Sequence, residues 1–344
     1  MPQYTISCLA PLAYPIIGFK GFAYCDNRKR DIYFNPIDVL GEEPHTIVFE
    51  GKKELPERIE LAWLSIIDKK CYAVEADIDK QKAEQLWKDN EASAEEASQL
   101  YKHVICGVLP NKSIGIYLYS ETKSILFQKL KANEINISIE LLPLSFIDSE
   151  SERILSENEE AREVATLGMP PSEFFDHWLE QFYYRYVPLE EYWDGENWQE
   201  YDEEDMFYDD IMINELHVQR FDGTHHELPD DISLIKYHEA GMPKRMALQW
   251  DEGRSHLSAY WWFDDQVLYP ILHRFFSLNP DARADILLRC DSRQECFEIA
   301  LKSGEMLQQP ITVLPEAYQL IVFKDGHELY KSENYNQEQG AWNW

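Results

Sequence analysis

The sequence predicts an α+β protein built from two tandem, related domains. The first observation is a repeated nine-residue motif, because residues 55–63 and 242–250 share Pro, Arg, Leu and Trp at matching positions. The second is that each copy is followed by the same series of patterns: another strand, an amphipathic helix and further short strands. Repeats of this kind are typical of duplicated units, and strand series with one packed helix are typical of α+β folds.

The first domain is predicted at residues 1–148, as an antiparallel sheet with one main packed helix. After Pro56, apolar residues alternate with polar ones, so that Ile59, Leu61 and Trp63 face one side of a half-buried strand. The remaining elements are expected as strands at 69–78, 103–110, 113–120 and 124–130 and a helix at 80–88.

The second domain is predicted at residues 211–344, as a loose repeat of the first. Met246, Leu248 and Trp250 alternate in the same way as their counterparts in the first copy. The remaining elements are expected as strands at 256–265, 284–290, 296–301, 311–314 and 318–326 and a helix at 265–276.

A middle segment, residues 149–210, joins the two domains and is predicted to be helical and then acidic. Residues 149–163 are polar and charged, which fits a linker or an exposed helix. Ser172 follows two prolines as a helix cap, and apolar residues from Phe174 to Tyr186 recur at helical spacing. This aromatic stripe fits packing between the domains or a partner-binding groove.

The acidic part of the middle segment predicts a contact surface. No Lys or Arg occurs between Tyr186 and Gln219, and six aromatic residues lie among the acids of 190–210. A solvated linker is poor in aromatic residues, so at least part of the segment should pack or bind. The partner-binding residues are predicted to be Glu190, Glu191, Trp193, Asp194, Glu196, Trp198, Tyr201, Asp202, Glu203, Glu204 and Asp205.

The sequence lacks the common motifs for metal binding and catalysis. The acidic run does not fit a calcium loop, and the six cysteines are scattered without a CxxC pair. His225 and His226 fit a solvated hairpin turn better than a ligand set. There is no nucleophile elbow, phosphate loop or zincin motif. The sequence therefore predicts no metal site, no cofactor, no catalytic residues and no enzyme, although a triad from distant positions stays open.

Charge limits the class of partner. The chain has 32 basic and 63 acidic residues, which gives a net charge of −31. Such a field repels nucleic acids and anionic membranes and attracts a basic protein. The N-terminus has neither a signal peptide pattern nor a lipidation site, so a cytoplasmic location is expected. The oligomeric state is left open.

The first copy of the repeat resembles an uncharacterised family of Gram-negative bacterial domains over about residues 1–135. The matching positions are Leu55, Pro56, Ile59, Trp63, Ser65, Tyr72, Gly107 and Pro110. Many members of that family are lipoproteins, and such domains are often found beside secreted antibacterial toxins, notably of type VI secretion. The resemblance implies an immunity protein. The chain departs from the family in lacking a lipoprotein leader, so a periplasmic role does not carry over.

Three hypotheses follow from the sequence. The first is a cytoplasmic immunity protein, an antitoxin whose acidic-aromatic surface covers the active site of a basic toxin domain. The second is a non-catalytic scaffold or adaptor protein in an endogenous assembly. The third is an enzyme with an acidic active site, which a metal-dependent gain in melting temperature would favour.

Overall fold

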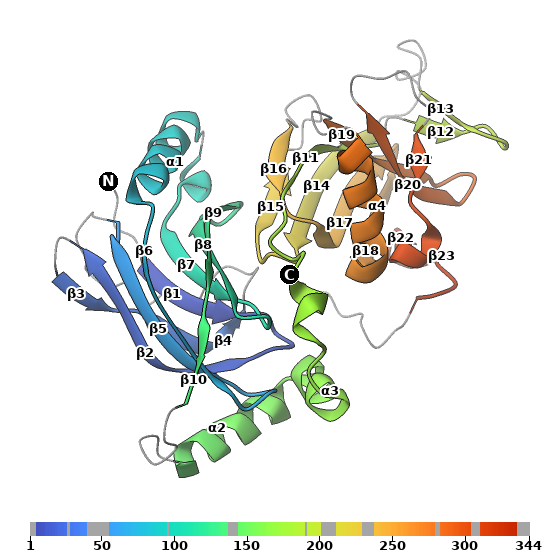
Figure 1. Ribbon diagram of the computed structural model, residues 1–344. Coiled ribbons are helices and arrows are strands. Elements are labelled where there is room, and N and C mark those ends of the chain that lie inside the picture. Colours follow the sequence, from blue (N-terminus) through green and yellow to red (C-terminus); the bar gives the residue numbers. More distant parts are fainter. Residues whose placement is uncertain are drawn as a thin grey trace. The chain divides into compact units, whose positions relative to one another are not determined.

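The chain folds as two compact units. The computed structural model describes residues 5–25, 28–39, 55–94, 96–136, 144–189, 191–200, 211–228, 237–278, 283–303 and 310–335. Unit 1 consists of Met1–Leu179 and Asp222–His225, and unit 2 consists of Glu180–Phe221 and His226–Trp344. The predicted α+β fold is confirmed, since antiparallel sheets dominate both units and helices are few (Figure 1). The chain therefore divides after Leu179, inside the middle segment expected at 149–210.

Unit 1 contains two five-stranded sheets. The first has the strand order β4 (Tyr33–Val39), β1 (Thr5–Ala10), β7 (His103–Val108), β8 (Ser113–Tyr119) and β9 (Ser124–Lys131). The second has the order β10 (Asn133–Ile135), β6 (Cys71–Asp77), β5 (Arg58–Ser65), β2 (Ile16–Cys25) and β3 (Arg28–Asp31). Only one sheet was expected here, and it was expected to be antiparallel throughout. In the first sheet β1 instead runs parallel to both of its neighbours.

A single core lies between these two sheets. Ile59, Leu61 and Trp63 of β5 each expose 1% of their surface, as the alternation predicted, and they share one apolar cluster with residues of β7 and β8. Helix α1 (Lys80–Ser93) begins at Asp79, whose side chain accepts a hydrogen bond from the backbone N–H of Lys82 at 3.0 Å. One helical face then adds Ala83 and Trp87 to the core.

The polar stretch after unit 1's sheets forms two helices, α2 (Leu144–Glu157) and α3 (Glu159–Leu167). The aromatic helix predicted to follow is wrong. Ser172–Phe175 forms one 3₁₀ turn, and Phe182–Pro188 is strand β11. Buried Phe182, Tyr184 and Tyr186 alternate with more exposed neighbours, which is the two-residue period of a strand. A dense aromatic run fits the spacing of a helix and that of a strand. Pairing with β19 favours the strand.

Unit 2 also contains two main sheets. The larger has the strand order β15 (His225–Leu228), β14 (Ile211–Arg220), β17 (Pro243–Glu252), β18 (Ser255–Phe263), β22 (Tyr318–Lys324) and β23 (His327–Lys331). The smaller has the order β16 (His238–Ala240), β11, β19 (Ala284–Asp291), β20 (Cys296–Ser303) and β21 (Ile311–Thr312). Helix α4 (Asp265–Leu278) follows β18, as expected, and a short ribbon pairs β12 (Glu191–Trp193) with β13 (Trp198–Glu200).

The strand order of unit 2 repeats that of unit 1. The run β3-β2-β5-β6-β10 corresponds to β15-β14-β17-β18-β22, and β1-β7-β8-β9 corresponds to β11-β19-β20-β21. Both first strands, β1 and β11, pair in parallel with the strand that follows the helix. A β-bulge also recurs: the register shifts next to Trp63 in the β2–β5 pair and next to Trp250 in the β14–β17 pair. Bulges are specific local features, so this coincidence favours the predicted repeat.

None of the helices in the described residues combines the length and the apolar character that a bilayer crossing requires.

Candidate functional site

The β12–β13 ribbon of unit 2 is the first candidate site. Trp193 and Trp198 lie opposite each other in its register, and their rings meet edge to face with centroids 5.6 Å apart. The connecting turn contains Gly195 at a φ of +104°, a conformation that side chains beyond glycine rarely adopt. One carboxylate oxygen of Asp194 closes the turn by accepting from the backbone N–H groups of Glu196 at 2.8 Å and Asn197 at 2.7 Å.

Two contacts anchor this ribbon to the end of strand β19. The backbone N–H of Trp193 donates to Asp291 at 3.0 Å. The carboxylate of Glu191, which is 7% exposed, pairs with the guanidinium of Arg289. The same guanidinium donates to Glu298 at 2.5 Å and lies 5.5 Å from the centroid of the Trp198 ring. Ion pairing and a cation–π contact therefore hold the ribbon against the end of β19.

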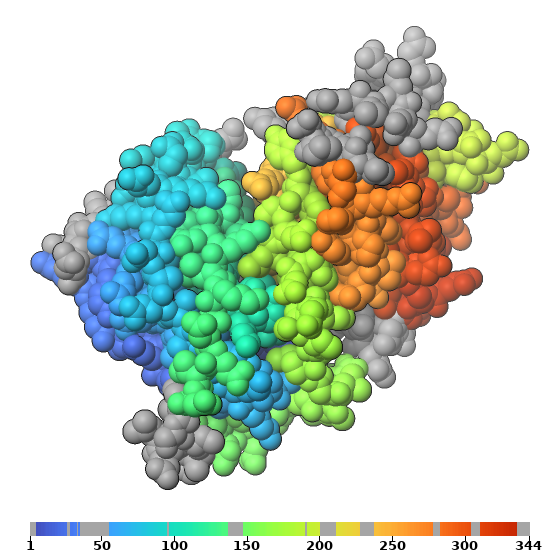
Figure 2. Space-filling model, in the orientation of Figure 1, coloured from blue at the N-terminus to red at the C-terminus, as the bar shows by residue number. Residues whose placement is uncertain are grey.

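The tip of the ribbon is exposed and acidic. Residues 194–197 are exposed, and the two tryptophans are half-buried (Figure 2, yellow-green at the edge of the red segments). Backbone N–H groups of Asn197 and then of Glu196 lower the pKa of Asp194, so its carboxylate stays charged well into acid conditions. The ribbon thus presents one carboxylate held in place, that of Asp194, and the exposed side chain of Glu196 beside a pair of aromatic rings.

The predicted partner-binding residues have different outcomes. Trp193, Asp194, Glu196 and Trp198 lie together on the ribbon. Glu191 is buried and faces Arg289, so its role is to hold the ribbon in place. The others lie outside the described residues: Glu190, Tyr201, Asp202, Glu203, Glu204 and Asp205.

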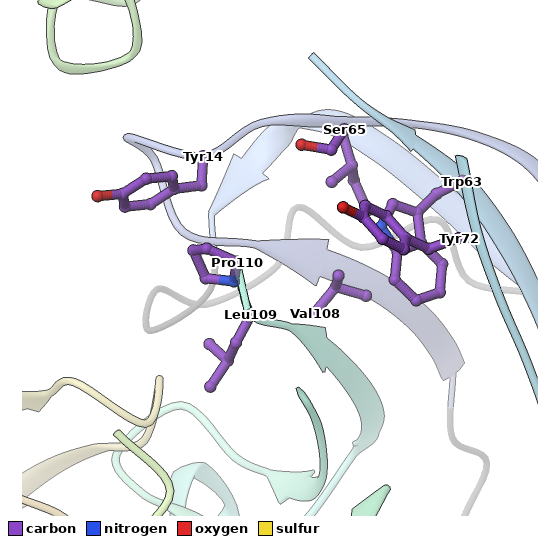
Figure 3. A pocket seen from close by; sticks show the side chains of 8 residues that line it. Tyr14, Trp63, Ser65, Tyr72, Val108, Leu109 and Pro110 are labelled. Carbon is purple, nitrogen blue, oxygen red and sulfur yellow. The ribbon is translucent and has the colours of Figure 1, made fainter. Parts of the chain in front are cut away.

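Unit 1 carries a second candidate, a small pocket at one end of its sheets (Figure 3). Its lining residues are Tyr14, Ile16, Trp63, Ser65, Tyr72, Val108, Leu109 and Pro110. The cavity volume is about 10 Å³, which is about the room that one water molecule needs. The pocket as it stands is therefore too small for a partner's side chain.

The polar groups of this pocket are held by neighbours. The Tyr72 hydroxyl donates to Asp68, and burial and then that hydrogen bond raise the pKa of Tyr72, which keeps its proton at neutral pH. Tyr14 packs edge to face against Phe175 at 5.1 Å and Trp178 at 6.2 Å between ring centroids. Sequence reasoning named Trp63, Ser65, Tyr72 and Pro110 as a signature without recognising a pocket. Tyr14 was missed altogether, because it is distant from them in the sequence.

The comparison with family models decides what unit 1 is. The model described as "Protein of unknown function (DUF2931)" matches residues 3–177, half of the chain and nearly all of the first segment of unit 1. The chain belongs to this family. No curated protein and no solved structure matches the chain. The resemblance to an uncharacterised domain family is thereby confirmed, and it extends further than the expected residues 1–135. The family's description names no activity, partner or compartment.

The pocket and the ribbon occupy corresponding places in their units. In the DUF2931 domain, the connection between β1 and β2 carries Tyr14, and the turn after β7 carries Leu109 and Pro110. In unit 2, the ribbon lies in the connection between β11 and β14 and is anchored to Asp291 where β19 ends. Both candidates therefore use the same end of the same topology, with a longer connection in unit 2.

Proposed function

We propose that the protein is a non-catalytic immunity protein that binds a basic toxin domain through the β12–β13 ribbon and the acidic residues that follow it. The observation that carries this proposal is the anchoring of the ribbon by Glu191, Arg289 and Asp291. A partner then meets two tryptophans and the Asp194 carboxylate already in place, which lowers the conformational entropy lost on binding.

The chemistry of the ribbon suits a basic cleft. Tryptophan is enriched among residues that dominate interface energetics, and Trp193 and Trp198 are half-buried on the ribbon. The net charge of −31 accelerates encounter with a basic protein. If the toxin is a nuclease, Asp194 and Glu196 would occupy the positions where it binds phosphate. A toxin delivered by type VI secretion or a related system and acting in the cytoplasm fits this reading.

The second candidate is a scaffold or adaptor protein in an endogenous assembly. The exposed ribbon fits it as well, because an aromatic and acidic surface can bind an endogenous protein as readily as a toxin. The two hypotheses predict different results for a gene deletion. Deleting the gene of an immunity protein is harmless once the toxin gene is also absent, whereas loss of a scaffold harms the cell regardless.

The decisive experiment is capture from native extract with the wild-type chain and an Asp194→Asn/Glu196→Lys variant. Asparagine can keep the turn hydrogen bonds, so the ribbon fold is retained while its charge is lost. Glu328→Lys, on the exposed part of β23, is the matched control for a change of surface charge. Retention of one basic toxin domain by wild type and control, with its loss in the ribbon variant, supports the proposal. Equal capture by all three chains would exclude the ribbon as the interface.

A further inference from the structure

We propose that unit 2 binds one divalent metal ion of the zinc type through Glu215, His217 and Glu227. Glu215 and His217 are two residues apart on β14, so both side chains lie on the same face of the sheet. Glu227 lies on β15, the neighbouring strand. The three potential ligand atoms all lie within 4.8 Å of one another. This site is separate from the ribbon and does not depend on the proposed function.

The three groups are close enough to reach one ion, once the direct contact between His217 Nε2 and Glu215 opens to admit it. Zinc binds imidazole nitrogen and carboxylate oxygen at about 2.0–2.2 Å, which leaves neighbouring ligand atoms roughly 3–4 Å apart. Two carboxylates this close repel each other, and the His217 imidazole lies in direct contact with the Glu215 carboxylate. A divalent cation between the three groups offsets both carboxylates.

Exposure leaves the ion accessible to further ligands. The His217 and Glu215 side chains are 21% and 34% exposed, and Glu227 is exposed. Three protein ligands on one side of an ion leave at least one position for water or a partner's side chain, as in zinc sites with an open position. The imidazole nitrogen favours zinc and its transition-metal neighbours over magnesium and calcium, which prefer oxygen alone.

Unit 1 has the same strand order but lacks the three potential ligands at the corresponding place. Counted from the shared bulge, Lys20 and Phe22 of β2 take the places of Glu215 and His217. There the Lys20 ammonium lies 2.8 Å from a carboxylate oxygen of Glu60, an ordinary ion pair. At this place unit 1 has a positively charged lysine side chain, whereas unit 2 has side chains that could bind a metal cation.

The test is calorimetric titration of Zn²⁺ into the full chain after chelator treatment. One equivalent should bind, and His217→Gln or Glu227→Gln should each weaken binding at least tenfold. Even changes to residues that only support the ligands of a metal typically cost about 10–100-fold in affinity. The control is His256→Gln. His256 lies 2.9 Å from Asp251 and belongs to no group of three ligands among the described residues, so its loss should leave binding unchanged.

Cobalt substitution separates this site from the six cysteines. Carboxylate and imidazole ligands give Co²⁺ spectra without thiolate charge-transfer bands, which is the expected result. Thiolate bands, no stoichiometric binding, or wild-type affinity in both variants would each overturn the proposal. Melting temperatures measured in chelator show whether His217→Gln still folds. If it does not, Glu227→Gln carries the test, because its exposed side chain contributes little to folding.

Discussion

At the scale of single residues, Arg289 controls the ribbon. Its side chain is 7% exposed and lies between the carboxylates of Glu191 and Glu298. Arg289→Met leaves the Glu191 carboxylate buried without its ion pair, and we expect a loss of about 3–5 kcal/mol in the free energy of unfolding. Urea denaturation measures this loss. The double variant Glu191→Leu/Arg289→Met removes both charges and should recover much of it. An equal loss in both variants would mean that packing, rather than charge, dominates.

Asp194 makes the ribbon sensitive to pH. Its pKa is lowered in the folded protein by backbone N–H donors, so the ionised form favours the closed turn. The stabilisation is therefore present above the ordinary pKa of Asp and is lost as the pH falls through the lowered value. A carboxyl titration followed by NMR should give Asp194 a lower pKa than a solvated Asp in a model peptide. An unshifted titration would show that the turn is open in solution.

At the scale of elements, Trp63 links the core of unit 1 to its pocket. It is 1% exposed, sits beside the β-bulge of β2 and β5, and packs against Tyr72 with ring centroids 5.9 Å apart. Trp63→Ala should cost about 3–5 kcal/mol of unfolding free energy, because a large cavity replaces the ring. Calorimetric unfolding checks the loss, with Trp63→Phe as a milder variant. A cost below 1 kcal/mol would show that the bulge is not held by this ring.

The elements also show what the sequence could and could not predict. Strands such as β5 were predictable because Ile59, Leu61 and Trp63 alternate and are buried on one side only. The aromatic run that includes β11 was not, because residues such as Tyr184 and Tyr186 fit helical and strand spacing alike. The second sheet of each unit was missed because the parallel pairing of β1 with β7 joins distant residues.

The candidate sites depend on such distant pairings even more strongly. Trp193 and Asp194 were named from local composition, because acid and aromatic residues alternate within a few positions. Their anchor, Arg289, is almost a hundred residues away and carries no local signal. For metal binding, the sequence drew attention to His225 and His226 and not to Glu215, His217 and Glu227, because only a hairpin register brings Glu227 beside the other two. Local sequence patterns can therefore name some residues of a candidate site, whereas the remaining residues come from strand pairing between distant parts of the chain.

At the scale of the whole molecule, charge governs encounter. The net charge of −31 acts over a Debye length of about 10 Å at 0.1 M salt, so association with a basic partner should slow as salt rises. Stopped-flow rates at increasing salt measure this, and dissociation should change far less than association. Rates independent of salt would place the interface on an uncharged surface.

The bulge beside Trp63 and Trp250 finally bears on ancestry. We infer that one gene segment was copied, because common descent explains an inserted residue at the same place, beside the same Trp, in both halves. After copying, the first half kept the sequence by which its family is recognised, and the second half was free to change. Its longer first connection and its Glu-His-Glu set are then features that the second half gained after copying. Relatives with one half only would preserve the state from which both descended.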